Sequence, residues 1–268
     1  MHGRPVLETG LPCYNAPAAR ISDAQVTISR MSAPSDIGPP VDWKPALRPQ
    51  RKVLRGVRVQ LEPFDAALHS DALHTSLHDQ DGDPRLWEHL PYGPFDKQSW
   101  NAWFSASAAP DDPLFFAVVD RDGAVARGQA SYLRIEPDHG VIEIGHIALG
   151  PAMQRRPAAT EAMFLLAAHA FDDLGYRRLE WKCDALNLRS RRAAERLGFT
   201  FEGVFRQHMV IKGRNRDSAW FSMIDREWPT LRTAFEQWLA PDNFDEAGRQ
   251  RRSLGDLRAS IGSALSQS

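Results

Sequence analysis

The sequence predicts an α/β domain that is not doubly wound. Two observations carry this prediction. Residues 114–149 read as three strands with turn residues between them, which is the pattern of an antiparallel meander. Two strand-then-helix units and a final pair of strands follow the meander, so the chain mixes both kinds of connection.

The first elements are a strand and two helices. Residues 57–64 alternate apolar and polar side chains, as a half-buried strand does. Residues 65–78 then predict a helix with one apolar face, made of Leu68, Ala72, Leu73 and Leu77. The aromatic, proline-bearing segment 84–95 predicts an ordered loop, and residues 97–109 predict a second short helix.

The remaining elements follow the same two periodicities. The meander strands are expected at 114–120, 124–135 and 141–149. The longest apolar helix is expected at 158–174, where Pro157 suits the first turn and Gly175 the end. After it we expect, in order, a strand at 178–183, a helix at 188–197, strands at 200–211 and 217–225, and a helix at 229–239.

The two ends of the chain differ from this central part. Residues 1–51 are rich in Pro, Ala and Ser and predict a flexible leader, in which both Met1 and Met31 are compatible with the true start. Residues 241–268 read as a polar tail. The predicted domain therefore spans residues 52–240.

Composition excludes several classes of protein. Of the 268 residues, 43% are hydrophobic and 25% charged, and the net charge is −1. Without a basic excess, we expect no nucleic-acid partner. No apolar run reaches the roughly 18 residues of a membrane span, and no secretion signal precedes the domain. The two cysteines, Cys13 and Cys183, lack any zinc or disulfide spacing, so we expect a cytoplasmic protein with no metal and no membrane partner.

A strand, a short turn and a long helix at 141–174 form the first candidate site. The free amide groups and the dipole of a helix N-terminus attract anions such as a pyrophosphate. Taken alone, this is also an ordinary strand-to-helix connection.

The segment 182–207 is more specific. It contains a strand that ends in Cys-Asp, then N-x-x-S, a helix, L-G-F and F-x-G-x-x-R. The residues that form this pattern are Cys183, Asp184, Asn187, Ser190, Leu197, Gly198, Phe199, Phe201, Gly203 and Arg206. This block, continued through 212–228, resembles the GNAT acyltransferases, in particular their RimJ/RimL-like branch.

The resemblance implies a fold and a reaction. The GNAT fold has a mixed, mostly antiparallel sheet of six to seven strands flanked by helices, with a V-shaped splay between the fourth and fifth strands. The implied activity is transfer of an acetyl or other acyl group from acetyl-CoA to a primary amine, by direct attack in a ternary complex.

The resemblance also implies a cofactor site. The backbone of the fourth strand would bond the pantetheine amides through Ile147, Ala148 and Leu149, and Asn187 would contact the pantetheine from the other side. The pyrophosphate would lie on the turn formed by Gln154, Arg155, Arg156, Ala158, Ala159 and Thr160. Pro157 replaces a family glycine there, which removes one N–H donor and adds bulk. Arg191 or Arg192 would meet the 3′-phosphate.

The catalytic groups depart from the common family pattern. The position that often holds an acidic tyrosine is Ala194 here, so Ser190 is the candidate for steering a proton to the thiolate. Ser190 could equally cap a helix. The candidate bases are Glu143 and His146, which face opposite sides of the strand unless a bulge intervenes, and a water chain could also serve. Cys183 is expected in the core.

The acceptor is left open. The candidates for an acceptor wall are Trp87, His89, Tyr92, Trp100 and Trp103. Core packing and dimerisation would use such rings equally well. A protein N-terminus, a polyamine, an aminoglycoside-like antibiotic and a small metabolite are all compatible, as are a monomer and a homodimer. The second functional reading is a CoA-binding, non-catalytic interaction or sensor protein, which Pro157 and Ala194 favour.

Overall fold

The computed structural model describes residues 37–78 and 84–265. The chain divides into two compact units, Met1–Asp42 and Trp43–Ser268, and the second unit contains every helix and strand described below. The expected start at Met31, and most of the expected leader, lie outside the described residues.

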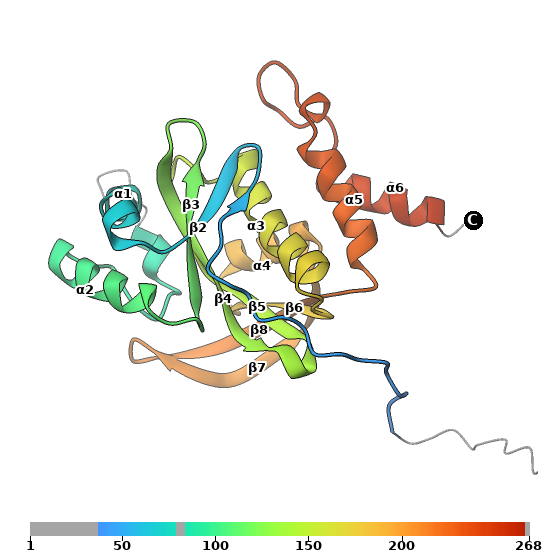
Figure 1. The fold of residues 1–268 in the computed structure, drawn as a ribbon, viewed down its shortest axis with the longest axis horizontal. Coiled ribbons are helices and arrows are strands. Elements are labelled where there is room, and N and C mark those ends of the chain that lie inside the picture. Colours follow the sequence, from blue (N-terminus) through green and yellow to red (C-terminus); the bar gives the residue numbers. More distant parts are fainter. Residues whose placement is uncertain (1–36, 79–83, 266–268) are drawn as a thin grey trace, which may run out of the picture. The chain divides into compact units, whose positions relative to one another are not determined.

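An eight-stranded sheet forms the centre of this unit, in the order β1-β2-β3-β4-β5-β6-β8-β7 (Figure 1). The strands are β1 Leu54–Arg55, β2 Val59–Pro63, β3 Leu114–Asp120, β4 Val125–Glu136, β5 Val141–Leu149, β6 Arg178–Asp184, β7 Thr200–Ile211 and β8 Arg214–Ile224. All neighbours pair antiparallel except β5 and β6, which are parallel. The seven longer strands match the predicted segments, and the two-residue β1 brings the number to eight.

Helices cover both faces of the sheet (Figure 1). They are α1 Ala66–His78, α2 Lys97–Ala108, α3 Pro157–Ala168, α4 Leu188–Leu197, α5 Trp228–Leu239 and α6 Leu254–Leu265. Helices α1 and α2 lie on one face, and α3, α4 and α5 lie on the other. Short 3₁₀ turns occur at Pro84–Trp87, Pro137–His139 and Pro241–Asn243.

Strand β3 shows why the sheet is apolar on both sides. Leu114, Phe116 and Val118 belong to the core on the α3 side, and the alternate residues Phe115, Ala117 and Val119 belong to the core on the α1 side. Because both faces are buried, the strand reads as a continuous apolar run instead of an alternating one.

Helix α1 packs on a face that differs from the predicted one. Leu68 is 68% exposed, and the buried residues include His69 and Ser70. Polar partners explain the rotation: His69 Nε2 lies 2.9 Å from Glu62 Oε2, and Trp100 Nε1 donates to the carbonyl of Ser70 at 2.9 Å. The prediction for Leu68 is therefore wrong, because these hydrogen bonds select the buried face.

The helix predicted at 158–174 is interrupted. Helix α3 ends at Ala168, and a π-helical turn follows at His169–Asp173. His169 Nδ1 lies 2.7 Å from Asp173 Oδ2 across this turn. Gly175, with φ +75°, ends the segment as expected.

Both ends of the second unit contact the sheet and its helices. Trp43 Nε1 donates to the carbonyl of Asp138, and the backbone N–H of Leu47 donates to the carbonyl of Leu174. The segment expected as a polar tail contains α6, whose Leu254 and Leu257 are buried in the core with α5. The compact unit thus extends past residues 52–240 on both sides.

Candidate active site

The parallel pairing of β5 with β6 stops early. It joins Val141–Glu143 to Arg178–Glu180, although β5 continues to Leu149 and β6 to Asp184. The predicted splay between the fourth and fifth expected strands is therefore confirmed. A cavity of about 290 Å³ lies at this opening, and five predicted site residues line it: Glu143, His146, Ile147, Asn187 and Ser190.

A β-bulge brings Glu143 and His146 to the same cavity. Gln129 pairs with Ala148 and Ser131 with Gly145, so β5 has one more residue than β4 between the two pairs. His146 adopts φ +52° inside this bulge. The extra residue cancels the alternation that would otherwise separate the two side chains.

His146 is a neutral hydrogen-bonding group. Burial, followed by the nearby charge of Arg216, lowers its pKa to about 4. The Tyr92 hydroxyl lies 3.0 Å from His146 Nδ1, and Gln129 Nε2 donates to that hydroxyl at 3.1 Å and to the His146 carbonyl at 3.3 Å. If Tyr92 donates to Nδ1 while it accepts from Gln129, its hydroxyl is used as both donor and acceptor, and we assign the imidazole proton to Nε2 on this ground.

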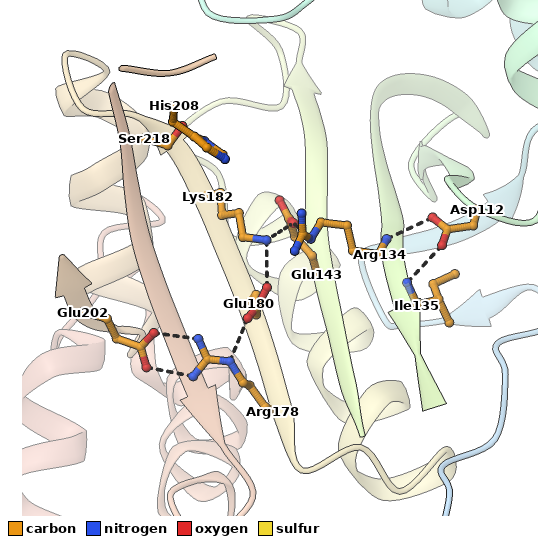
Figure 2. Close-up of polar contacts among 10 residues, drawn as sticks. All are labelled: Asp112, Arg134, Ile135, Glu143, Arg178, Glu180, Lys182, Glu202, His208 and Ser218. Carbon is orange, nitrogen blue, oxygen red and sulfur yellow. Dashed lines mark hydrogen bonds and ion pairs between the residues drawn. The ribbon is translucent and has the colours of Figure 1, made fainter. Parts of the chain in front are cut away.

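Glu143 belongs to a chain of charged side chains (Figure 2). Lys182 Nζ lies 2.8 Å from Glu143 Oε2 and 2.8 Å from Glu180 Oε2. Arg178 joins Glu180 to Glu202, with contacts of 2.8 and 2.6 Å to the latter carboxylate. Burial raises the pKa of Glu143, against the opposing effect of Lys182. The carboxylate is thus desolvated but held in place by a cation.

Arg134 reaches Glu143 from the neighbouring strand. Its backbone has φ +51°, which is uncommon outside glycine. Asp112 fixes this turn by accepting the N–H groups of Arg134 and Ile135, both at 3.0 Å (Figure 2). The guanidinium Nε then lies 3.6 Å from Glu143 Oε2.

Asn187 and Ser190 have different roles at the start of α4. Asn187 is the N-cap residue, and its side chain accepts the Ser190 N–H at 3.0 Å. The Ser190 hydroxyl instead accepts from Trp181 Nε1 at 3.0 Å. The capping alternative for Ser190 is therefore wrong, because Asn187 takes that position and leaves the Ser190 hydroxyl at the cavity.

Two residues of this region lie in the core. Cys183 is 5% exposed and burial raises the pKa of its thiol, as expected of a core residue. Ala194 is fully buried and does not line the cavity. A side chain at that position would enter the packed core of this chain.

The turn before α3 has the geometry of a helix N-terminus, with Pro157 as the first helical residue. Arg155 and Arg156 are exposed, and Ala158 and Ala159 are half-buried. The side chains of Gln154 and Thr160 form hydrogen bonds within the protein. Gln154 Nε2 donates to the Leu149 carbonyl at 2.7 Å, and Thr160 Oγ1 accepts from Arg196 at 3.0 Å.

Two basic residues of α4 differ in their surroundings. Arg191 donates to the Ala185 carbonyl at 3.3 Å and lies 5.5 Å from the centre of the Phe201 ring. Arg192 is exposed.

The aromatic segment meets the cavity through one expected residue, His89, and three residues that were not predicted. Trp87 is 2% exposed and belongs to the core beside α1, and neither it nor Tyr92 nor Trp103 lines the cavity. The lining residues of this segment are Leu86, His89, Leu90 and Pro91. His89 Nδ1 lies 3.3 Å from Asp184 Oδ2.

The β7–β8 hairpin supplies further lining residues that sequence reasoning missed, including His208, Arg216 and Ser218. His208 Nδ1 lies 2.8 Å from Ser218 Oγ. Residues 214–218 are polar at every position, a pattern that resembles an ordinary solvent-facing hairpin and gives no signal of a cavity.

Within the described ranges, no three His, Cys, Asp or Glu side chains converge as a metal-binding group. No helix in residues 37–78 or 84–265 is long and apolar enough to cross a membrane.

Comparison with known proteins agrees with this geometry. The acetyltransferase (GNAT) domain family matches residues 58–200. A GCN5-related N-acetyltransferase from Brucella melitensis is 49% identical, with a TM-score of 0.79, and the match covers 81% of this chain and 99% of that one.

Two curated relatives are more distant. N-acetyltransferase p20 of Bacillus licheniformis is 29% identical over 42% of this chain, and YdaF of Bacillus subtilis, named as a proposed ribosomal N-acetyltransferase, is 28% identical over 40%. The chain spans 63% and 57% of the length of these two relatives. The chain belongs to the GNAT acetyltransferase family.

Proposed function

We propose that this protein is an N-acetyltransferase that moves an acetyl group from acetyl-CoA to a primary amine. The observation that carries the proposal is the opening between β5 and β6, where a cavity brings together Glu143, His146 and Ser190. Family membership supports acetyl transfer, and the residues present around the opening are compatible with the cosubstrate.

The opening suits an extended, amide-containing arm. Beyond Glu143, β5 has no β6 partner, so its backbone can bond such an arm as a strand would. The Leu149 carbonyl already accepts from Gln154 but has a second lone pair. When bound, acetyl-CoA would supply a thioester that an amine can attack.

The start of α3 suits the pyrophosphate. Pro157 removes one amide donor, whereas the helix dipole and the exposed cations Arg155 and Arg156 remain. We expect this site to bind the cosubstrate more through charge than through close backbone contact.

Proton transfer is assigned from the hydrogen bonds. In the reaction a bond forms between the amine nitrogen and the acetyl carbon, the bond from that carbon to sulfur breaks, and one proton passes from the nitrogen to a base. We assign this proton to Glu143, because its carboxylate lines the cavity and burial raises its pKa. His146 is the weaker candidate, since its Nδ1 is bonded to Tyr92 and its pKa is about 4.

Ser190 is placed to protonate or solvate the departing thiolate. Its oxygen accepts from Trp181, so its own proton can be donated to the neighbouring Cys183 sulfur or to a group in the cavity. A hydroxyl is a weak acid, and its expected contribution is orientation of a proton or water.

The proposal is tested by measuring release of free CoA thiol from acetyl-CoA across a panel of primary amines. We expect amine-dependent release with at least one class of acceptor. Saturable acetyl-CoA binding without release on any amine would instead support the non-catalytic alternative.

The proton assignment has its own test. Glu143→Gln should lower kcat by about 10²-fold or more, the usual contribution of a general base. His146→Gln should have a smaller effect on kcat, and Ser190→Ala should slow turnover at saturating substrate. A Glu143→Gln enzyme with unchanged kcat would remove Glu143 from the mechanism, provided that CoA affinity is measured in parallel.

A further inference from the structure

Arg216 is a charged residue of the cavity for which no side-chain hydrogen bond is found among the described residues, and the proposed chemistry gives it no role. Its side chain lines the cavity, and its Nε atom is buried without a hydrogen-bond partner. Within residues 37–78 and 84–265, no ion pair of Arg216 is found. A guanidinium remains charged at any pH the protein meets, and a buried donor without an acceptor is unfavourable.

The other charged groups of the cavity already have partners. Lys182 is bonded to Glu143 and Glu180, and Arg134 also contacts Glu143. Asp184 is paired with His89. Among the cavity cations of the described residues, Arg216 is therefore the one for which no ion-pair partner is found.

The imidazoles nearby respond to this charge. Arg216 is the second contributor, after burial, to the lowered pKa of both His146 and His208. Two independent side chains on different strands thus sense the same unpaired cation.

Arg216 lies on the face of the sheet opposite α3. Lys182 pairs with Trp220 and Asp184 with Ser218, so these residues share one face of β6 and β8, and Arg216 is two residues further along β8. The opposite face carries Trp181 and Cys183, which pack with α3 and α4. Because the expected phosphate site is at the start of α3, a cosubstrate phosphate does not account for Arg216.

We propose that Arg216 binds a carboxylate of the acceptor, so that preferred acceptors are primary amines that also carry a carboxylate. This inference rests on the proposed acetyltransferase function and narrows its substrate class. A carboxylate matches the fork of a guanidinium, and its single charge is tolerated beside Glu143 and Asp184 better than a dianion would be. A polycationic amine would instead be repelled by Arg216.

The test uses acceptors that differ only in charge. Glutamate and its diamide, glutaminamide, form the free amino acid arm, and the carboxamide-capped peptides Glu-Ala-Ala and Gln-Ala-Ala form the peptide arm. We expect a kcat/KM about 10- to 100-fold higher for the acidic member of at least one pair, the range of a charged hydrogen bond. The arm that shows this preference identifies the source of the carboxylate.

Variants then assign the preference to one side chain. Arg216→Gln should reduce the ratio of kcat/KM between the acidic and the amide acceptor to about threefold or less, and Arg216→Lys should retain part of the preference. Arg214→Gln is the matched control, because Arg214 is an exposed residue of the same strand that does not line the cavity. A preference that survives Arg216→Gln, or equal rates for both members of both pairs in the unaltered protein, would overturn the inference while leaving acetyl transfer intact.

A binding measurement covers the case in which no acceptor is turned over. In the presence of CoA, calorimetry should show tighter binding of N-acetylglutamate than of N-acetylglutaminamide, which has no carboxylate, and Arg216→Gln should abolish the difference. That result would support the carboxylate site even if the proposed function failed, and equal binding of the two compounds would overturn it.

Discussion

The two faces of strand β6 are both buried but are stabilised in different ways. Leu179, Trp181 and Cys183 point into the apolar core beside α3 and α4. Glu180 and Lys182 point the other way, and their side chains are only 8% and 6% exposed. Apolar burial is favourable by itself, whereas a buried charge is tolerated only when it is paired. Burial alone therefore does not show whether a residue of β6 stabilises the fold through apolar contacts or through paired charges.

Removal of the central cation should have the largest effect. Lys182→Met leaves Glu143 and Glu180 buried without their shared partner, and should lower the free energy of unfolding by about 3–5 kcal/mol. Urea denaturation followed by circular dichroism measures the change.

A matched variant separates charge from packing. Adding Glu143→Gln and Glu180→Gln to Lys182→Met should restore most of the lost stability, because the buried charges then disappear together. If Lys182→Met alone cost less than about 1 kcal/mol, the charged face would not depend on pairing.

A truncation on the apolar face should have a somewhat smaller effect of a different kind. Leu179 is fully buried, and Leu179→Ala should cost about 3 kcal/mol through lost burial and the cavity left behind. The cost should not change between low and high salt. A strong salt dependence would show that the two faces are coupled.

Glu202, at the end of the series of ion pairs, allows a test of how stability depends on pH. Bonding to Arg178 lowers the pKa of Glu202 from its ordinary 4.5 to about 2. A lowered carboxyl pKa stabilises the folded state above pH 4.5, and this stability is lost as the pH falls from 4.5 toward 2. Since Glu202 is partly exposed, we expect its ion pair to contribute only about 1 kcal/mol to the free energy of unfolding. The difference in unfolding free energy between the unaltered protein and Glu202→Gln should thus shrink as the solution is acidified.

Exposed charges should matter least. Arg155→Gln combined with Arg156→Gln should leave the unfolding free energy within about 0.5 kcal/mol. The KM for acetyl-CoA should rise by about three- to tenfold at low salt, and less at high salt, because exposed charges are screened. Steady-state kinetics at two ionic strengths checks both statements, and an unchanged KM would contradict the proposed role of these two arginines.

Much of the fold could be predicted, because local patterns correspond to elements. The alternation in 178–183 predicted β6 and the side of it that faces the apolar core. The block from Cys183 to Phe199 predicted the position of α4 between β6 and β7. The exposure of Leu68 could not be predicted, because side-chain hydrogen bonds to other elements, of His69 to β2 and of Trp100 in α2 to Ser70, select the buried face of α1.

The candidate site was predicted only in part. Glu143, His146 and Ser190 were named, whereas the bulge that aligns the first two depends on pairing with β4. Arg216 was missed because an arginine in a polar hairpin has the same pattern whether it faces solvent or a cavity.

The sequence by itself determined the order of the strands and helices, the family and a short set of candidate catalytic residues. Periodicity, turn residues and the N-x-x-S to L-G-F block are local properties of the sequence, so they can be recognised without knowing which residues are in contact. Only the tertiary structure decided which charges are paired: Lys182 with two carboxylates, His89 with Asp184, and Arg216 with none that we find in the described part of the chain. Pairing depends on side chains brought together from distant strands, and the strength of such interactions depends on their burial.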